Sequence, residues 1–111
     1  MLDNKNIVKV ITKNSLVEKF FSAAINFTRD NLSENYNNIY HHIGIYSYKV
    51  NALEKFVSLS QSKNEIQNKL EQLRALDNKI KINVALAKSS PIGVDTKEDY
   101  LAIKKIMEYK L

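Results

Sequence analysis

One short stretch near the middle of the sequence, His42-Ile-Gly-Ile-Tyr-Ser-Tyr48, constrains the fold more than any other. Its two isoleucines take one side of a two-residue alternation, and its two tyrosines take the other. An extended segment that is apolar on both sides belongs inside a sheet covered on both faces. We therefore expect residues 42–48 to form a central strand, with helical layers supplied by the periodic segments that follow it.

Length and composition bound the class of protein. A chain of 111 residues allows one domain at most, with a modest core. Its 44% apolar and 26% charged residues are ordinary for a globular protein. No apolar run approaches the ~20 residues that span a bilayer, the first residues lack the order of a secretory signal, and there is no cysteine. We expect a cytoplasmic protein without a membrane span.

The net charge of +5 raises the question of a nucleic-acid partner. All but two of the 17 basic residues are lysines, and the two arginines are Arg29 and Arg74. Arginine is the residue preferred for bidentate contacts with phosphates and guanine. The make-up of the charge therefore argues against nucleic acid as the main partner.

The remaining segments follow from hydrophobic periodicity and turn residues. The expected elements are strands at 7–11 and 16–21 forming a hairpin, an irregular loop region at 22–41, helices from 50 and at 64–77, an edge strand at 80–87, and a helix from 96 to about 109. We interpret residues 1–111 as a single partial domain of the α/β class.

Few residues in the middle of the chain indicate chemistry by themselves. His41 and His42 lack the spacing of a helical zinc site, and a histidine at a strand end is more often a hydrogen-bonded structural residue. Glu71 and Gln72 are most simply interpreted as solvent-exposed residues on the flank of a helix. With only two glycines in the chain, there is no glycine-rich phosphate loop.

Asp95 is a more specific candidate. Thr96 and Asp99 have the spacing of a capping box, so Asp95 is not needed to cap the last helix. Its carboxylate is then available for an Asx turn or for Mg²⁺, which prefers oxygen ligands. One carboxylate does not decide between these two roles.

Three segments together are similar in order and spacing to one family. They are His42-Ile-Gly-Ile-Tyr-Ser-Tyr-Lys49, Leu70-Glu-Gln-Leu-Arg-Ala-Leu76 and Gly93-Val-Asp-Thr-Lys-Glu-Asp99. Val8-Lys-Val10 and Phe20-Phe-Ser22 fit the strand pair that precedes them in that family. From about residue 7 to its end, the chain resembles the C-terminal half of the 3-deoxy-manno-octulosonate (KDO) cytidylyltransferases, also called CMP-KDO synthetases.

The resemblance implies a Rossmann-like nucleotidyltransferase fold, a mixed sheet flanked by helices, with the nucleotide-binding half absent. It also implies a homodimer and a Mg²⁺-dependent reaction in which KDO attacks the α-phosphate of CTP, giving CMP-KDO for lipopolysaccharide synthesis. By position, the KDO pocket would be lined by His42, Tyr46, Glu71 and Gln72. Asp95 would be one of two aspartates on the metal.

The chain also departs from the family pattern. After Ser22 the family has an arginine that pairs with the sugar carboxylate, whereas this chain continues with Ala23. Losing such a charge-assisted bond weakens affinity roughly 10–100-fold. Three functional readings stay open: one piece of a cytidylyltransferase that is inactive alone, a degenerate remnant without activity, or a small basic interaction module.

Overall fold

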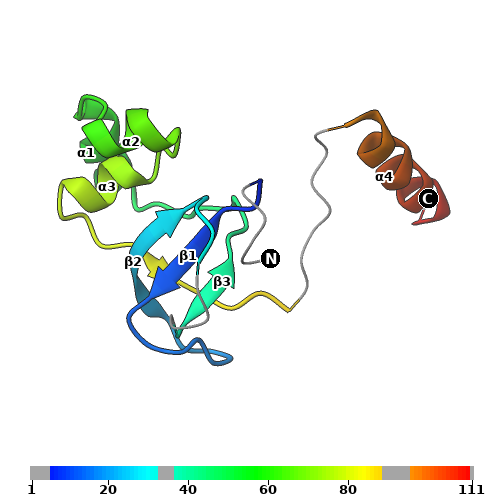
Figure 1. Cartoon of the computed structure of the whole chain (residues 1–111), viewed down its shortest axis with the longest axis horizontal. Helices are drawn as coiled ribbons and strands as arrows, with labels where there is room; N and C mark the ends of the chain where they lie inside the picture. Colours follow the sequence, from blue (N-terminus) through cyan, green and yellow to red (C-terminus); the bar gives the residue numbers. More distant parts are fainter. Residues whose placement is uncertain (1–5, 33–36, 89–95, 111) are drawn as a thin grey trace.

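The structure is a computed structural model that describes residues 6–32, 37–88 and 96–110, without the side chains of 109 and 110. Within these ranges the chain forms strands and helices in mixed order (Figure 1). The elements are β1 (Lys9–Thr12), β2 (Ser22–Thr28), β3 (Ile39–His41), α1 (Val50–Ser58), α2 (Lys63–Asn68), α3 (Leu73–Asp77), β4 (Asn83–Val84) and α4 (Lys97–Lys110).

The strands form one sheet in the order β3-β1-β2-β4. Val10 on β1 lies opposite Phe27 on β2 and Tyr40 on β3, and β4 pairs with the start of β2. The expected α/β class and the edge position of the last strand are confirmed. The difference is that every pair among the described strands is antiparallel, where a mixed sheet was expected.

A small apolar core lies where α3 contacts the sheet. Val10 and Phe27 pack with Leu70 and Leu73, and none of the four is more than 4% exposed. Figure 1 shows α1, α2 and α3 gathered on the β2 side of the sheet. Partly buried side chains surround this cluster: Val8, Ala24, Tyr40, Leu76, Ile82 and Val84. The spacing of Ile66, Leu70, Leu73 and Leu76 in the sequence predicts one buried face. Leu70 and Leu73 confirm it and Leu76 is partly buried, whereas Ile66 is 60% exposed.

The expected central strand at 42–48 is wrong. Regular pairing ends with β3 at His41, and residues 42–49 have no strand structure. Ile45 is 80% exposed, so the segment is not covered on two faces. The alternation has a different origin: Tyr46 and Tyr48 bring their rings within 6.2 Å of each other outside any sheet. The two-residue spacing of Tyr46 and Tyr48 therefore reflects a contact between their rings and not a strand.

The expected hairpin exists, but its second strand is displaced along the sequence. β1 is confirmed, whereas residues 16–21 have no strand structure and contain a turn at 18–19, with Lys19 at a φ of 71°, and β2 begins only at Ser22. The loop predicted for 22–41 is therefore wrong over β2 and β3. The reason is local: the Ser22 hydroxyl accepts a hydrogen bond from the Asn14 backbone N–H at 2.8 Å, and Phe27 enters the core.

The helix expected at 64–77 is two short helices. α2 starts at a capping box in which Ser62 and Glu65 exchange hydrogen bonds of 3.0 and 3.2 Å. It ends at Lys69, whose φ of 54° is left-handed, and α3 begins at Leu73. Because a left-handed residue turns the chain out of the helix, Leu70 and Leu73 both reach the core.

α3 ends in a complete Schellman motif. The Ile80 N–H bonds to the Ala75 carbonyl at 2.8 Å, and the Lys79 N–H bonds to the Leu76 carbonyl at 3.1 Å. Lys79 occupies the left-handed position of this motif with a φ of 59°, where glycine is usual. Lysine thus takes a glycine position at the ends of both α2 and α3.

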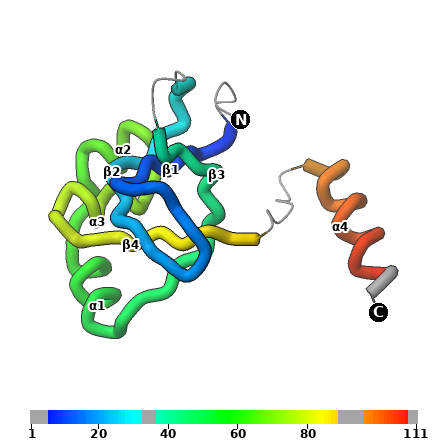
Figure 2. Tube along the Cα trace, turned by 90° about the horizontal axis from the view of Figure 1, so that it is seen from below, coloured from blue at the N-terminus to red at the C-terminus, as the bar shows by residue number. Residues whose placement is uncertain are grey.

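The predicted last helix, α4, is confirmed together with its capping box. The Asp99 N–H bonds to the Thr96 hydroxyl at 3.1 Å, and the Thr96 N–H bonds to the Asp99 carboxylate at 3.2 Å. The apolar spacing of Tyr100, Ile103, Ile106 and Met107 predicts a buried face for this helix. That face is not covered, since Tyr100 and Met107 are more than half exposed. Figures 1 and 2 both show α4 apart from the sheet and the other helices. No helix in the described ranges is long and apolar enough to cross a bilayer.

Candidate functional site

His42 and Tyr46 form a hydrogen-bonded pair just beyond the end of β3. The His42 Nε2 atom and the Tyr46 hydroxyl oxygen are 2.7 Å apart, and the tautomer of the ring decides which one donates. The His42 ring is nearly perpendicular to the ring of Phe27 in the core, with a centroid distance of 5.5 Å. This contact joins the pair to the sheet, so the end of β3 places His42.

The environment keeps both members of the pair uncharged. Burial lowers the pKa of His42, and the neighbouring His41 lowers it further. Burial also raises the pKa of Tyr46 to about 12, with smaller contributions from Tyr48 and Glu71. At neutral pH the pair is therefore a neutral imidazole and a protonated phenol. Such groups exchange hydrogen bonds with hydroxyls and carboxylates without a buried charge.

Glu71 and Gln72 lie between α2 and α3. Glu71 is close enough to Tyr46 for its negative charge to raise the pKa of the phenol. Gln72 is the residue before α3, and its side-chain Nε2 is buried without a hydrogen-bond partner among the described residues. An unsatisfied buried donor costs about 1–3 kcal/mol, so this amide is suited to a ligand oxygen or a water.

Ring contacts continue from this pair to the helices. His42, Tyr46, Tyr48 and Phe56, which we call the aromatic row, follow one another at centroid distances of 5.6, 6.2 and 6.2 Å. The guanidinium carbon of Arg74 lies over the Phe56 ring, 4.7 Å from its centroid. The row therefore connects the end of β3 with α1 and α3.

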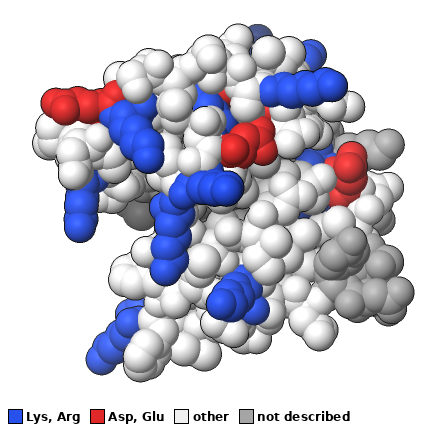
Figure 3. Space-filling view, turned by 90° about the vertical axis from the view of Figure 1, so that its left-hand side faces the viewer, with Lys and Arg blue, Asp and Glu red and all other residues white. Residues whose placement is uncertain are grey.

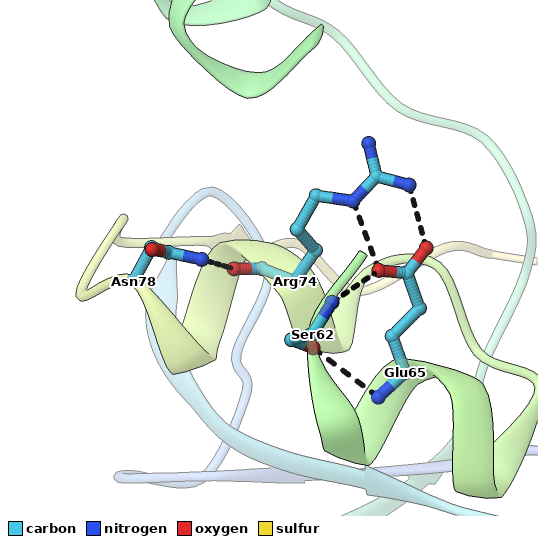
Figure 4. A network of polar contacts seen from close by, with 4 residues as sticks. All are labelled: Ser62, Glu65, Arg74 and Asn78. Carbon is cyan, nitrogen blue, oxygen red and sulfur yellow. Dashed lines mark hydrogen bonds and ion pairs between the residues drawn. The ribbon is translucent and has the colours of Figure 1, made fainter. Parts of the chain in front are cut away.

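Arg74 is held in turn by a buried carboxylate (Figure 4). Its Nη2 and Nε atoms donate to the two Glu65 oxygens at 2.6 and 2.9 Å, and Glu65 is only 4% exposed. The hydrogen bonds from Arg74 lower the pKa of the Glu65 carboxyl, although burial opposes the shift. In the same network the Asn78 side chain donates to the Arg74 backbone carbonyl at 2.7 Å.

Comparisons with known proteins bear on this geometry. A profile of the family described as cytidylyltransferase matches residues 2–82. The chain belongs to the cytidylyltransferase family. It is 43% identical over 105 residues to a 3-deoxy-manno-octulosonate cytidylyltransferase of Bartonella bacilliformis, which covers 95% of this chain and 42% of that protein. It is also 43% identical over 96 residues to the enzyme of the same name from Brucella ovis, covering 86% of this chain and 38% of that protein.

A solved structure is similar over nearly the whole of this cytidylyltransferase chain. It is a CMP:2-keto-3-deoxy-manno-octonic acid synthetase complexed with CTP, with a TM-score of 0.78 and 27% identity over 99% of this chain and 45% of that one. The expected nucleotidyltransferase fold is thereby confirmed. This chain spans about two-fifths of the length of the curated relatives it matches.

The structure brings together some of the residues that the sequence singled out. His42 and Tyr46 touch, Glu71 acts on Tyr46 through its charge, and Gln72 follows Glu71 with an unsatisfied amide. Asp95 lies outside the described residues. Within the described ranges, no three histidine, aspartate or glutamate side chains are grouped so that they could hold a metal ion.

Sequence reasoning missed three residues that are connected with the candidate site through side-chain contacts. Tyr48 was assigned to the expected central strand, while Phe56 and Arg74 were covered only by the helices expected from 50 and at 64–77. A signal did exist, because Tyr46, Tyr48 and Phe56 are the first three tyrosine or phenylalanine residues that follow His42 in the sequence. The contact between Phe56 and Arg74 connects α1 with α3, and periodicity alone does not predict a contact between two helices.

Proposed function

We propose that this chain provides the sugar-acid side of a CMP-KDO synthetase, with KDO bound beside His42, Tyr46, Glu71 and Gln72. The observation that carries the proposal is the neutral His42–Tyr46 pair with the Glu71 charge beside it. The names of the relatives support KDO as the sugar acid. An eight-carbon sugar acid offers several hydroxyls and a carboxylate to such groups.

Each side chain has a distinct role in this proposal. The Tyr46 hydroxyl and the His42 ring exchange hydrogen bonds with sugar hydroxyls, while the Glu71 carboxylate accepts from another hydroxyl. The buried Gln72 amide donates to a sugar oxygen and so gains its missing partner. Ala23 stands where the family places a carboxylate-binding arginine, so we expect weaker binding than in the relatives.

In the complete reaction the sugar acid attacks the α-phosphate of CTP and displaces pyrophosphate. Positioning the nucleophile is the part that these residues perform, since they hold the sugar acid. We propose that the 111 residues do not complete the reaction by themselves, because they span about two-fifths of the relatives. The nucleotide would be held by the portion of those relatives that this chain does not cover.

Mg²⁺ stays a prediction for this chain. The described residues do not supply a metal site, and we derive no step through the ion. We propose Asp95 as one ligand, and Mn²⁺ as a paramagnetic substitute tests it. Selective broadening of the NMR signals around Asp95, lost in Asp95→Asn, supports the assignment, and uniform broadening counts against it.

A cytoplasmic location and a homodimer also stay predictions.

Direct binding of KDO is the first experiment. We expect calorimetric or NMR titration of the chain with KDO to show saturable binding that Tyr46→Phe weakens about tenfold, because one hydrogen bond is lost while the ring stays. Tyr100→Phe on the exposed surface of α4 is the matched control and should bind as the unmodified chain does. Equal binding by Tyr46→Phe and the control would contradict the proposed site.

Complementation tests the whole reaction. We expect the chain, mixed with the portion of the Bartonella bacilliformis relative that it does not cover, to release pyrophosphate from CTP in the presence of KDO and Mg²⁺. Each piece alone should be inactive. A mixture that stays inactive, with both pieces folded by circular dichroism and no KDO binding, favours the reading as a degenerate remnant.

The reading as a basic interaction module has less support. On the face drawn in Figure 3, lysine and arginine side chains are spread over the surface with acidic side chains between them. Nucleic-acid binding depends on neutralising many phosphates together and weakens steeply with salt. Retention on nucleic acid at low salt, lost at high salt, would revive this reading.

A further inference from the structure

Tyr46 lies in a segment that has little backbone support. Residues 42–49 belong to no strand or helix, and the one backbone hydrogen bond recorded within the segment runs from the Ile45 N–H to the Ile43 carbonyl at 2.8 Å. The described contacts that place the Tyr46 ring are therefore side-chain contacts. They are its hydrogen bond to His42 and its ring contacts along the aromatic row.

The far end of the aromatic row is held much more firmly. Arg74 makes two hydrogen bonds to Glu65, and a planar guanidinium loses little freedom in forming such a paired contact. Glu65 cannot turn away easily, because its Oε2 atom also accepts the Ser62 N–H at 3.0 Å. The Arg74 guanidinium carbon then lies over Phe56, 4.7 Å from the ring centroid, and so limits the movement of that ring.

We propose that Arg74 is a positioning residue for the candidate sugar-acid site, acting through Phe56 and Tyr48 on the place where Tyr46 meets His42. The centroid distances along the row fall inside the range of roughly 4.5–7 Å at which aromatic pairs attract. The ligand named in this inference rests on the proposed function, whereas the positioning of Tyr46 does not.

Arg74 has a second route to the same site. It lies three residues after Glu71 and two after Gln72, at the start of α3. Its contact with Phe56 joins α3 to α1, and its pair with Glu65 joins α3 to α2. Fixing α3 in this way holds Glu71 at the distance from which its charge acts on Tyr46.

The first test compares two substitutions at the contact between α2 and α3. Arg74→Lys keeps the positive charge but loses the planar fork over Phe56. Asn64→Ala is the matched control, since it removes the exposed 3.0 Å hydrogen bond from Asn64 to Asp77 between the same helices. The readouts are the phenol titration of Tyr46, followed by its assigned ¹³Cζ NMR signal, and the ¹⁵N shifts of the His42 ring.

We expect Arg74→Lys to lower the pKa of Tyr46 from about 12 toward the ordinary value near 10, because looser packing admits water to the phenol. The His42 ring shifts should change with it, and Asn64→Ala should change neither. A folded Arg74→Lys chain whose Tyr46 and His42 signals match those of the control overturns the proposal. Should Arg74→Lys fail to fold, Glu65→Asp, which shortens the carboxylate by one methylene, takes its place with the same two outcomes.

The route through Phe56 is tested by combining substitutions. Phe56→Leu removes the ring but keeps an apolar side chain, and we expect it to shift Tyr46 as Arg74→Lys does. If Arg74 acts through Phe56, the double variant shifts Tyr46 no further than the stronger single variant. Additive shifts would overturn this route.

A measurement of KDO affinity separates this inference from the proposed function. If the unmodified chain binds KDO, Arg74→Lys should weaken binding about tenfold and Asn64→Ala should not. If the unmodified chain does not bind KDO, the proposed function fails, while the Tyr46 and His42 signals still decide whether Arg74 positions the pair.

Discussion

α2 and α4 begin in the same way and end up in different surroundings. Ser62 with Glu65, and Thr96 with Asp99, form capping boxes with hydrogen bonds of 3.0–3.2 Å. Glu65 is buried and also binds Arg74, so the start of α2 belongs to the packed body of the chain. α4 has fourteen residues and stands apart (Figure 2).

The difference teaches that a capping box fixes where a helix starts and says nothing about what the helix contacts. Both boxes satisfy backbone N–H groups locally. Only around α2 do the leucines that follow reach the apolar core, because the chain turns at Lys69. The capping box of α2 therefore starts a segment that contributes to the apolar core, whereas the capping box of α4 affects only its own helix.

The largest expected contrast is between the two acidic residues of the boxes. We expect Glu65→Gln to lower the melting temperature by about 10 °C or more, because it leaves the Arg74 guanidinium without its charged partner in a buried setting. Asp99→Asn should change it by less than about 2 °C, since a surface substitution on α4 leaves the core intact. Thermal melts followed by circular dichroism measure the melting temperatures of both variants. Similar shifts in Glu65→Gln and Asp99→Asn would contradict the expected difference between the two capping boxes.

The pH dependence of stability follows from the same carboxylate. Arg74 holds the pKa of Glu65 below its ordinary 4.5, so below that pH the folded chain binds fewer protons than the unfolded chain. The stabilisation is complete above 4.5 and is lost as pH falls through the folded value. Melting temperatures from pH 7 to pH 3 should therefore fall more steeply for the unmodified chain than for Glu65→Gln. Parallel curves would show that Glu65 is not responsible.

The hydroxyl members of the boxes should show a smaller contrast. Removing a cap costs about 1 kcal/mol, so we expect Ser62→Ala to lower the melting temperature by about 5 °C. Thr96→Ala should instead reduce the helical signal at 222 nm while the melting temperature of the core stays the same. Loss of core stability in Thr96→Ala would mean that α4 is coupled to the rest of the chain.

The smallest expected effect concerns the surface of α4. Lys104 and Glu108 are exposed and lie one helical turn apart, with a 4.0 Å ion pair. We expect Lys104→Ala to weaken the helix by about 0.3 kcal/mol at low salt and not measurably in 1 M NaCl. Helical content in the two buffers checks this, and an effect that salt does not reduce would exclude an ion-pair origin.

Sequence patterns predicted those elements whose stability is local. The capping box found the start of α4, the β-branched run found β1, and leucine spacing found Leu70 and Leu73 in the core. The break at Lys69 was not predictable, because lysine carries no signal for a left-handed φ.

The candidate site was predictable only in part. His42 and Tyr46 came from a resemblance, and the structure shows them in contact. The supporting residues were not found, because Phe56 meets Arg74 from another helix and no periodicity relates the two. The alternation around Tyr46 was misread as a strand because Tyr46 and Tyr48, which are in ring contact, have the same two-residue spacing as side chains on one face of a strand.

The lysines at the ends of α2 and α3 have a practical consequence. Lys69 and Lys79 both occupy backbone conformations in which a Cβ atom is unfavourable and which glycine or asparagine adopts readily. Neither residue belongs to the candidate sugar-acid site or to the aromatic row. Replacing both lysines with asparagine should therefore raise the thermal stability of the protein, which helps crystallisation and long titrations. The residues of the candidate site stay unchanged.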